Sequence, residues 1–418
     1  MKKPILIIVF RFPPMGGIGS RRWAKFAKYL AQDGYHVHVL TIDYPYSDLI
    51  NWTRDVQGKE IIVHRVRSDY PVFMLKENKS FTDKVLSYLF SKTLEKLFFY
   101  LDPAQRWGKR LIPYAVKLIR DKKIKNVIVS GPPSSVHYAG ALIKAENPGI
   151  NLIQDYRDPW NSDRDYEYGT KLPFKWQKDK SLKMEEFTIK HSDSIVVVTI
   201  DMKKLIDRQF KDAKMKTKVI YNGYDCDDYN FLRNSEKKHS FDMIYAGSVD
   251  FSENGRGKAL EYIAEAIQSL NDDFINNNLK VIIHSNLRFQ NASDNKFKNH
   301  FVFNPLIPIN KIFTEMNNYS YCLSINAIPD AHAFGTKIFN YMALGKKILH
   351  ISNGGELYEL MEKTGQFVSR YDIESIKKQL LLMKEDFLSR KCDEPQKQNM
   401  YGEFNIKELT KQVEQLLI

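Results

Sequence analysis

Short apolar runs alternate with longer amphipathic stretches along most of the chain. In the first half, the apolar runs begin at Ile5, His36, Glu60, Asn126, Asn151 and Ser194. Segments between them, such as 21–32 and 134–145, carry apolar residues at helical spacing. Strands that are apolar on both faces and separated by helices are typical of a parallel sheet covered by helices. This pattern predicts a doubly wound α/β domain.

The same alternation starts again after a polar stretch, 225–240, that has no periodicity. The new apolar runs begin at Phe241, Leu279, His300, Ser320 and Lys346. We therefore predict an α/β protein with two Rossmann-like, doubly wound parallel-sheet domains at 1–223 and 241–400, followed by a terminal helix within 401–418. Two such domains would face a central cleft, where ligands usually bind.

The charge of the chain narrows the class of its partners. The 418 residues carry a net charge of +13, which favours an anionic partner such as a nucleic acid, a membrane surface or a phosphorylated substrate. Basic runs at 109–125 and 203–218 contribute to this excess, although solvated helix faces explain such runs equally well. No nucleic-acid-binding motif accompanies the charge, so we expect no nucleic-acid partner.

The cysteines and the first apolar run indicate the compartment. The three cysteines are far apart and form no Cys-x-x-Cys pair, which fits a reducing cytoplasm rather than a disulfide framework or a zinc site. The run at Ile5–Phe10 is too short for a secretory signal or a membrane-spanning helix. We predict a cytoplasmic protein, with the inner face of the cell membrane as a further location.

The segment 81–123 has two explanations. It contains the apolar stretches VLSYLF and LEKLFFYL and then a basic helix. Docking on an anionic membrane surface is one explanation. Internal helical packing is the simpler one.

Three loops that follow strands carry candidate chemistry. The first, RFPPMGGIGSRR, has glycines that let the backbone approach a ligand, although its spacing is not the dinucleotide fingerprint. The second, SGPPSSVHYAG, places His137 in the first turns of a helix, as a site residue or as a capping or packing histidine. The third, DYRDPW, places Arg157 and Asp158 just after a strand, where they either act on a ligand or pair with each other.

These loops belong to a longer series of motifs that resembles bacterial family 4 glycosyltransferases of the GT-B type with a family-4-like N-terminal domain. The motifs stand in the expected order over nearly the whole chain: FPPMGGIGSRR, SGPPSSVH, DYRDPW, VIYNGYD, IYAGS and GTKIFNYMALGKKIL. The resemblance implies a nucleotide sugar held mainly by the C-terminal domain and an acceptor held mainly by the N-terminal domain. It also implies retention of anomeric configuration without a metal or cofactor, and a terminal helix that crosses back to the first domain.

The segment after 330 carries the candidate donor site. Residues 336–344 read as a short helix stopped by Gly345, so Gly335 and Thr336 lie at a helix start suited to a diphosphate. Lys337 adds positive charge there, and Arg256 and Lys258 are candidates for a second clamp. Positive charge is needed because the nucleoside diphosphate leaves with its charge increased.

The chain departs from the family pattern within this segment. Similar enzymes carry two glutamates eight positions apart, where this chain has His332 and Asn340. The second glutamate binds the ribose hydroxyls, and Asn340 has one acceptor oxygen where a carboxylate has two. The departure leaves altered donor choice or loss of activity open.

These motifs lead to the hypothesis of a metal-independent, retaining, hexosyltransferase-type enzyme of bacterial surface polysaccharide synthesis. It would use a UDP- or GDP-sugar and a glycan or lipid-linked acceptor. The predicted catalytic residues are His137, Asp158 and His332, and the predicted donor-binding residues are Gly16, Gly17, Arg256, Lys258, Gly335, Thr336, Lys337 and Asn340. The alternatives are a sugar-nucleotide 2-epimerase of the same fold and a non-catalytic GT-B binding protein.

Overall fold

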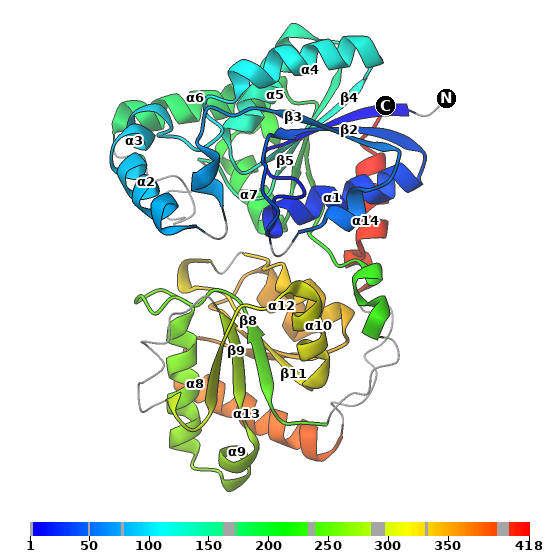
Figure 1. The fold of residues 1–418 in the computed structure, drawn as a ribbon. Coiled ribbons are helices and arrows are strands. Elements are labelled where there is room, and N and C mark those ends of the chain that lie inside the picture. The colour runs from blue at the N-terminus through cyan, green and yellow to red at the C-terminus, as the bar shows by residue number, and fades with distance from the viewer. Residues whose placement is uncertain are drawn as a thin grey trace. The chain divides into compact units, whose positions relative to one another are not determined.

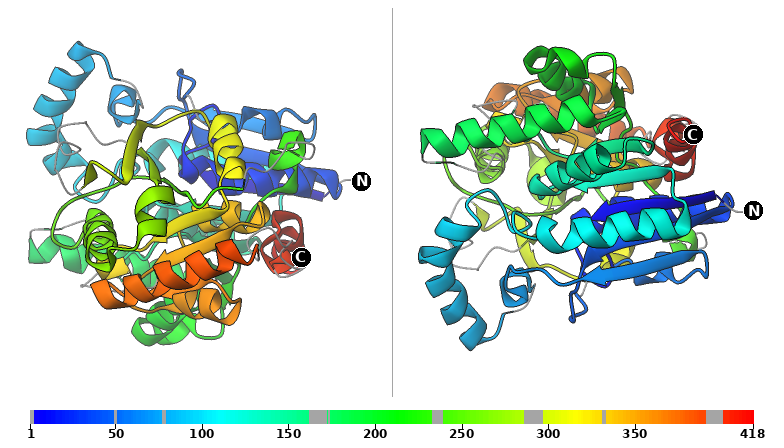
Figure 2. Two further views of the ribbon diagram at one scale, coloured as in Figure 1. Left: turned by 90° about the horizontal axis from the view of Figure 1, so that it is seen from below. Right: turned by 90° about the horizontal axis from the view of Figure 1, so that it is seen from above.

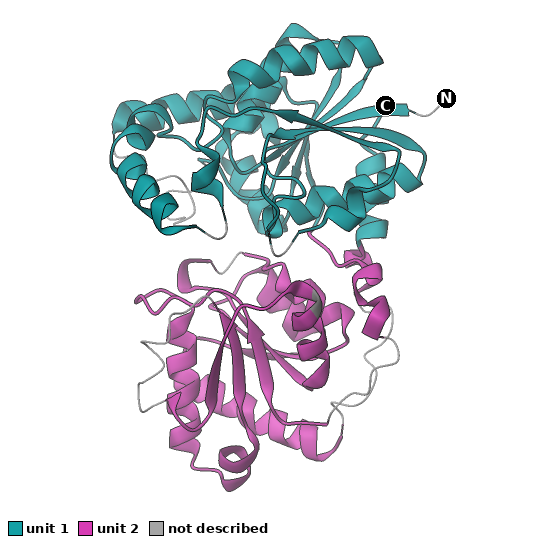
Figure 3. Ribbon diagram, in the orientation of Figure 1, with its two compact units in different colours: residues 1–221, 406–418 teal, residues 222–405 magenta. Residues whose placement is uncertain are grey.

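The chain folds into two compact units. The computed structural model describes residues 3–48, 51–76, 79–161, 172, 174–232, 239–285, 297–330, 333–390 and 401–418. Unit 1 comprises Met1–Tyr221 together with Ile406–Ile418, and unit 2 comprises Asn222–Asn405 (Figure 3). The C-terminal segment therefore belongs to the same unit as the N-terminus.

Unit 1 is built on a seven-stranded parallel sheet in the order β3-β2-β1-β4-β5-β6-β7. The order reverses at β1, which pairs with β2 on one side and β4 on the other. The central strands are fully buried because their side chains are apolar on both faces. The strands are β1 (Lys3–Val9), β2 (Tyr35–Ile42), β3 (Ile61–Val66), β4 (Asn126–Gly131), β5 (Asn151–Tyr156), β6 (Ser194–Val197) and β7 (Thr217–Val219).

Helices cover both faces of this sheet (Figures 1 and 2). Helices α4, α5 and α6 pack side by side on one face, and α1 packs against α14 on the other. Two further helices, α2 and α3, lie at one end of unit 1, away from the sheet (Figure 2). The helices are α1 (Ile18–Gln32), α2 (Phe81–Lys92), α3 (Leu94–Phe98), α4 (Gly108–Lys122), α5 (Ser135–Glu146), α6 (Lys175–His191), α7 (Ile200–Gln209) and α14 (Ile406–Glu414).

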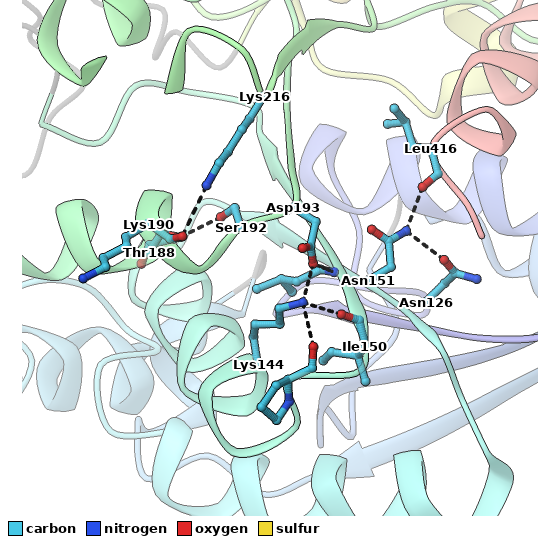
Figure 4. A network of polar contacts seen from close by, with 12 residues as sticks. Asn126, Lys144, Ile150, Asn151, Thr188, Lys190, Ser192, Asp193, Lys216 and Leu416 are labelled. Carbon is cyan, nitrogen blue, oxygen red and sulfur yellow. Dashed lines mark hydrogen bonds and ion pairs between the residues drawn. The ribbon is translucent and has the colours of Figure 1, made fainter. Parts of the chain in front are cut away.

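Hydrogen bonds attach the end of the chain to the sheet of unit 1 (Figure 4). Asn126 Nδ2 donates to Ile418 O at 3.1 Å, and Ile418 N donates to Asn126 Oδ1 at 3.0 Å. Asn151 Nδ2 donates to Leu416 O at 2.7 Å and to Asn126 Oδ1 at 2.9 Å. The amides of β4 and β5 therefore bind the last turns of the chain directly.

Unit 2 repeats the architecture with a six-stranded parallel sheet in the order β10-β9-β8-β11-β12-β13. The strands are β8 (Met243–Ala246), β9 (Val281–Ser285), β10 (Phe301–Pro305), β11 (Tyr321–Ile325), β12 (Lys347–Ile351) and β13 (Phe367–Ser369). The helices are α8 (Gly257–Leu270), α9 (Asp273–Asn278), α10 (Ile309–Asn318), α11 (Lys337–Ala343), α12 (Glu356–Lys363) and α13 (Ile373–Leu388). These two sheets confirm the predicted fold class of paired Rossmann-like domains.

None of the helices among the described residues combines the length and apolar character that a bilayer-spanning segment needs.

Candidate functional site

Arg157 joins three loops at the carboxyl edge of the unit 1 sheet. Its Nε donates to Gly131 O at 2.9 Å, its Nη1 to Gly19 O at 2.7 Å and its Nη2 to Pro132 O at 2.7 Å. Burial lowers the pKa of Arg157, while the neighbouring carboxylates of Asp158 and Asp155 act in the opposite direction. The guanidinium therefore fixes the glycine loop after β1 and the proline loop after β4 onto the end of β5.

A buried ion pair joins α1, which follows the first loop, to β5, which precedes the third. Arg22 Nη2 is 2.9 Å from Asp155 Oδ1, and both side chains are almost fully buried. Trp23 Nε1 and Ser130 Oγ also donate to Asp155 Oδ2, at 2.7 and 2.8 Å. Burial alone would raise the pKa of Asp155, but Arg22 and these hydrogen bonds hold it below its ordinary value. Arg22 also donates to the backbone carbonyls of Ile220 and Tyr221, which follow β7. Together with the bonds from Trp23 and Ser130, the pair links α1, β4 and β5.

His137 is enclosed within unit 1. It is 2% exposed, its ring stacks on Tyr156 with centroids 4.2 Å apart, and its Nδ1 is 2.6 Å from Gln154 Oε1. A Cβ atom at Gly131 would lie 2.5 Å from His137 Nε2, so a larger residue at the end of β4 would displace the ring. Burial lowers the pKa of His137 to about 4, and the ring is neutral at pH 7. These contacts hold His137 inside unit 1, beside the end of β4.

The other predicted residues of unit 1 lie closer to its surface. Asp158 follows β5 and is exposed. Gly17 has a φ of 78° and is also exposed, whereas Gly16 is buried. The Gly16 amide donates to Asp48 Oδ2 at 2.7 Å. The Gly16 amide, which we predicted to contact the nucleotide-sugar donor, is therefore hydrogen-bonded to the Asp48 carboxylate instead.

Two cations lie together in unit 2. Lys337 opens α11, and its Nζ lies 5.4 Å from the ring centre of Tyr245. A Cβ atom at Gly247 would lie only 1.9 Å from that Nζ, so the glycine that follows β8 leaves the space that the ammonium occupies. Burial, followed by repulsion from Arg256, lowers the pKa of Lys337 to about 8. In the part of the chain that the structure describes, no carboxylate forms an ion pair with Lys337.

Arg256 is held in place by backbone and side-chain contacts. It precedes α8, and its Nε donates to Ile325 O at 3.2 Å while its Nη1 donates to Ser248 Oγ at 3.2 Å. Asp330 lies 4.0 Å from its Nη2. Burial is the main cause of the lowered pKa of Lys337, and repulsion from Arg256 adds to it, so a bound anion would raise that pKa.

Lys258 is engaged elsewhere. Its Nζ is 3.0 Å from Glu261 Oε2 on the same helix and 5.2 Å from the ring centre of Tyr262. A hydrogen bond from Lys258 to Glu261 raises the pKa of the lysine. The charge of Lys258 is therefore offset by Glu261, unlike that of Lys337.

The structure places the remaining donor-site candidates at α11. Gly335 is exposed, and Thr336 is the residue that precedes the helix. Asn340 is half-buried, and its Oδ1 accepts a hydrogen bond from Tyr229 at 2.6 Å. Tyr229 lies on a 3-10 helix, Cys226–Leu232. Its hydroxyl therefore binds the oxygen of Asn340 that we expected to accept a hydrogen bond from a ribose. His332 lies outside the described residues.

Sequence reasoning did not single out Gly247, Tyr229 or Glu185. Gly247 lies in the IYAGS motif, which was the available signal for a close approach. Glu185 lies on the buried face of α6, where its Oε2 accepts two hydrogen bonds from Asn161 at 3.0 and 2.9 Å. Burial raises the pKa of Glu185 to about 8. Its helical neighbours give no sequence signal for this environment.

Comparison with known proteins defines the class of the chain. Two Rossmann-like parallel-sheet units with these loops constitute a GT-B glycosyltransferase fold. Glycosyltransferase Family 4 matches residues 15–228, which is just over half of the chain. The chain therefore belongs to this family.

One curated relative and two solved structures illustrate the likeness. An uncharacterized glycosyltransferase from Methanocaldococcus jannaschii is 34% identical over 71 residues, or 17% of this chain and 18% of the relative. A glycosyltransferase from Rickettsia africae is 13% identical, with a TM-score of 0.61 over 99% of this chain and 98% of its own. A UDP-GlcNAc 2-epimerase from M. jannaschii is 12% identical, with a TM-score of 0.52 over 100% of this chain and 99% of its own. At these identities the two structures show a shared fold alone.

Proposed function

We propose that the protein transfers a sugar from a UDP- or GDP-sugar to a glycan or lipid-linked acceptor, in bacterial surface polysaccharide synthesis at the inner face of the cell membrane. The observation that carries the proposal is the pair of cations in unit 2, Arg256 and Lys337. Lys337 has its pKa lowered by burial and by Arg256 and has no carboxylate partner among the described residues. A nucleoside diphosphate supplies the missing negative charge.

The same two cations would assist the reaction. When the bond between the sugar and the diphosphate breaks, negative charge accumulates on the leaving phosphate oxygens. A fixed guanidinium and a partly desolvated ammonium stabilise that charge more strongly than water does. The pKa of Lys337 would rise toward its ordinary value as the diphosphate binds.

In the proposed mechanism the configuration at the anomeric carbon is retained without a metal or a cofactor. The acceptor attacks on the face from which the diphosphate departs, and the diphosphate oxygen takes the acceptor proton. The protein then contributes positioning and charge stabilisation. Asp158, which is exposed after β5, is the proposed contact to the acceptor, and His332 the proposed contact to the sugar.

We expect the transferase activity to survive treatment with EDTA, because the mechanism uses no metal. Loss of activity that a divalent cation restores would contradict this mechanism.

A thermal-shift panel tests the proposal. UDP, GDP, CDP and their common sugars are added in turn to the whole protein. A ligand present at about 100 times its dissociation constant adds roughly 2.7 kcal/mol to the free energy of unfolding. We expect one nucleotide and its sugar to raise the melting temperature. No shift with any member of the panel would contradict the proposal.

The shared fold of the M. jannaschii epimerase keeps sugar-nucleotide epimerisation as a second candidate. An epimerase converts its donor without an acceptor, whereas a transferase releases nucleoside diphosphate in step with acceptor glycosylation. Incubating the protein with the donor that gives the thermal shift, and analysing the sugar by NMR, separates the two. A protein that binds the donor without converting it under either condition would be a non-catalytic GT-B binding protein.

His137→Ala tests whether the buried histidine is catalytic or supports the loops. The contacts with Gln154 and Tyr156 lead us to expect a loss of about 1–3 kcal/mol in the free energy of unfolding, with unchanged nucleotide affinity. The measurements are urea unfolding and turnover of the same variant. Unchanged stability with turnover lowered by about 10- to 1,000-fold, equal to about 1.4–4 kcal/mol of barrier, would instead make His137 catalytic.

The pH dependence of stability gives an independent check on His137. Its pKa is about 4 in the folded protein, against an ordinary value of 6.5. Below pH 6.5 the unfolded chain therefore takes up a proton that the folded protein excludes. The contribution of the neutral ring is present above pH 6.5 and is lost as the pH falls toward 4. We expect the stability difference between wild type and His137→Ala to shrink by about 2 kcal/mol between pH 7.5 and pH 5. A difference independent of pH would contradict burial of the ring.

A further inference from the structure

Helices α2 and α3 expose an unusual concentration of apolar side chains. Phe81 is 81% exposed, Leu97 70% and Tyr88 63%. We define the α2–α3 surface by these residues together with Leu86, Leu89 and Phe98, all of which are also exposed. Internal packing, the simpler explanation of the sequence, therefore does not hold for these positions. Exposed large apolar side chains gathered on two successive helices are typical of an interaction site.

The two helices are firmly attached to unit 1 by their other side. A capping box between Ser80 and Asp83 starts α2. Phe90, on the inner side of α2, contacts the rings of Tyr70 and Phe99 at 5.6 and 6.0 Å. The exposed side chains therefore lie on a defined helical element.

Positive charge accompanies the apolar side chains. Lys84, Lys92 and Lys96 are exposed on the same two helices. The Nζ of Lys92 lies 5.6 Å from the ring centre of Tyr88, and the guanidinium of Arg106 lies 5.3 Å from that of Phe98. Basic side chains beside aromatic rings are typical of helices in the interface between lipid headgroups and acyl chains.

The acidic groups of these helices are turned to internal partners. Asp83 is buried and pairs with Lys76 at 3.0 Å. Glu95 accepts a hydrogen bond from Tyr70 Oη at 2.6 Å. The charges that α2 and α3 present to a partner are therefore mainly lysines, which complement an anionic surface.

From these observations we propose that the α2–α3 surface docks the protein on an anionic phospholipid bilayer. The helices would lie in the plane of the headgroups, with the apolar side chains inserted and the lysines at the phosphates. A protein partner fits less well, because lysine is depleted in the cores of protein interfaces. A symmetric dimer through this patch would also bring the lysines of both copies together. The inference adds a partner to the proposed function but does not require sugar transfer.

Vesicle flotation of the whole protein tests the proposal. We expect the protein to float with vesicles of phosphatidylcholine and phosphatidylglycerol and to bind pure phosphatidylcholine vesicles less tightly. Replacing Leu86, Leu89 and Leu97 with glutamine should weaken binding by roughly tenfold or more. Met215→Gln is the matched control, because Met215 is 88% exposed elsewhere on unit 1. An equal effect of the leucine variant and its control would overturn the proposal.

A second set of variants separates charge from apolar insertion. Replacing Lys84, Lys92 and Lys96 with glutamine should weaken binding to the anionic vesicles by about fivefold per lysine. The control replaces the exposed lysines Lys211, Lys214 and Lys218. Melting temperatures should stay unchanged in all variants, since the side chains are exposed. Absence of flotation, or a concentration-dependent dimer that only the leucine variant loses, would refute membrane docking. Because no sugar is present, neither result bears on the proposed transferase activity.

Discussion

Replacing Asp155 with asparagine is expected to lower the free energy of unfolding of unit 1 by about 3–5 kcal/mol. The substitution removes the ionised partner of the buried Arg22 guanidinium, and breaking one side of a buried ion pair is strongly destabilising. Trp23 and Ser130 lose an ionised acceptor in the same step. Urea unfolding, followed by hydrogen exchange of amides in β4 and β5, would report the loss in the unit concerned.

Asp121→Asn is the control for this experiment. Asp121 pairs with Arg120 at 3.5 Å, but both side chains are well exposed. Exposed ion pairs contribute between zero and about 1 kcal/mol. If Asp155→Asn and Asp121→Asn lower the urea midpoint equally, the buried Arg22–Asp155 pair stabilises unit 1 no more than an exposed pair does.

Removing both cations of unit 2 is the second change with a large expected effect. Arg256→Ala combined with Lys337→Ala should weaken the binding of the preferred nucleoside diphosphate by about 3–6 kcal/mol, because each charged hydrogen bond contributes about 1.5–3 kcal/mol. Isothermal titration calorimetry of the double and single variants gives the affinity. Thermal unfolding without nucleotide shows whether the loss of the Arg256 contacts with Ile325 and Ser248 has damaged unit 2.

Lys258→Ala is the matched control, since Lys258 is a neighbouring lysine paired with Glu261. We expect it to change the affinity much less than Lys337→Ala. The wild-type affinity should also fall as the pH rises through 8, where Lys337 loses its proton, and Lys337→Ala should lack this step. Equal affinities of Lys337→Ala and wild type would remove the cation pair from the donor site.

The alternation of apolar runs and helical segments was sufficient to predict the fold class. Strands such as 5–9 and 127–129 are apolar at every position because helices cover both faces of the sheet. The short helix expected from Thr336 was also predicted closely, since α11 begins one residue later. Both the buried strands and the start of α11 are determined by neighbouring residues in the sequence, so they can be predicted from it.

The partners of the candidate site residues depend on contacts distant in sequence. Lys337 lies beside Gly247, and Asn340 binds Tyr229, so neither environment can be read from the surrounding residues. The sequence drew attention to Asp158 after the strand, while Asp155 within it carries the ion pair to Arg22. The pairing of the candidate Lys258 with Glu261 could be expected from the sequence, because residues three apart on a helix are neighbours.

The attachment of the last turns to Asn126 and Asn151 has a consequence for the order in which the protein is completed. In the sequence, unit 2 is inserted between the two segments of unit 1, after Tyr221 and before Ile406. A ribosome therefore finishes unit 2 before it releases the segment that binds β4, β5 and α1. The strands of unit 1 are the first to emerge during synthesis, but Asn126, Asn151 and α1 stay without their C-terminal partners until the last residues are made. Unit 1 is thus the first unit to begin folding and the last to be completed.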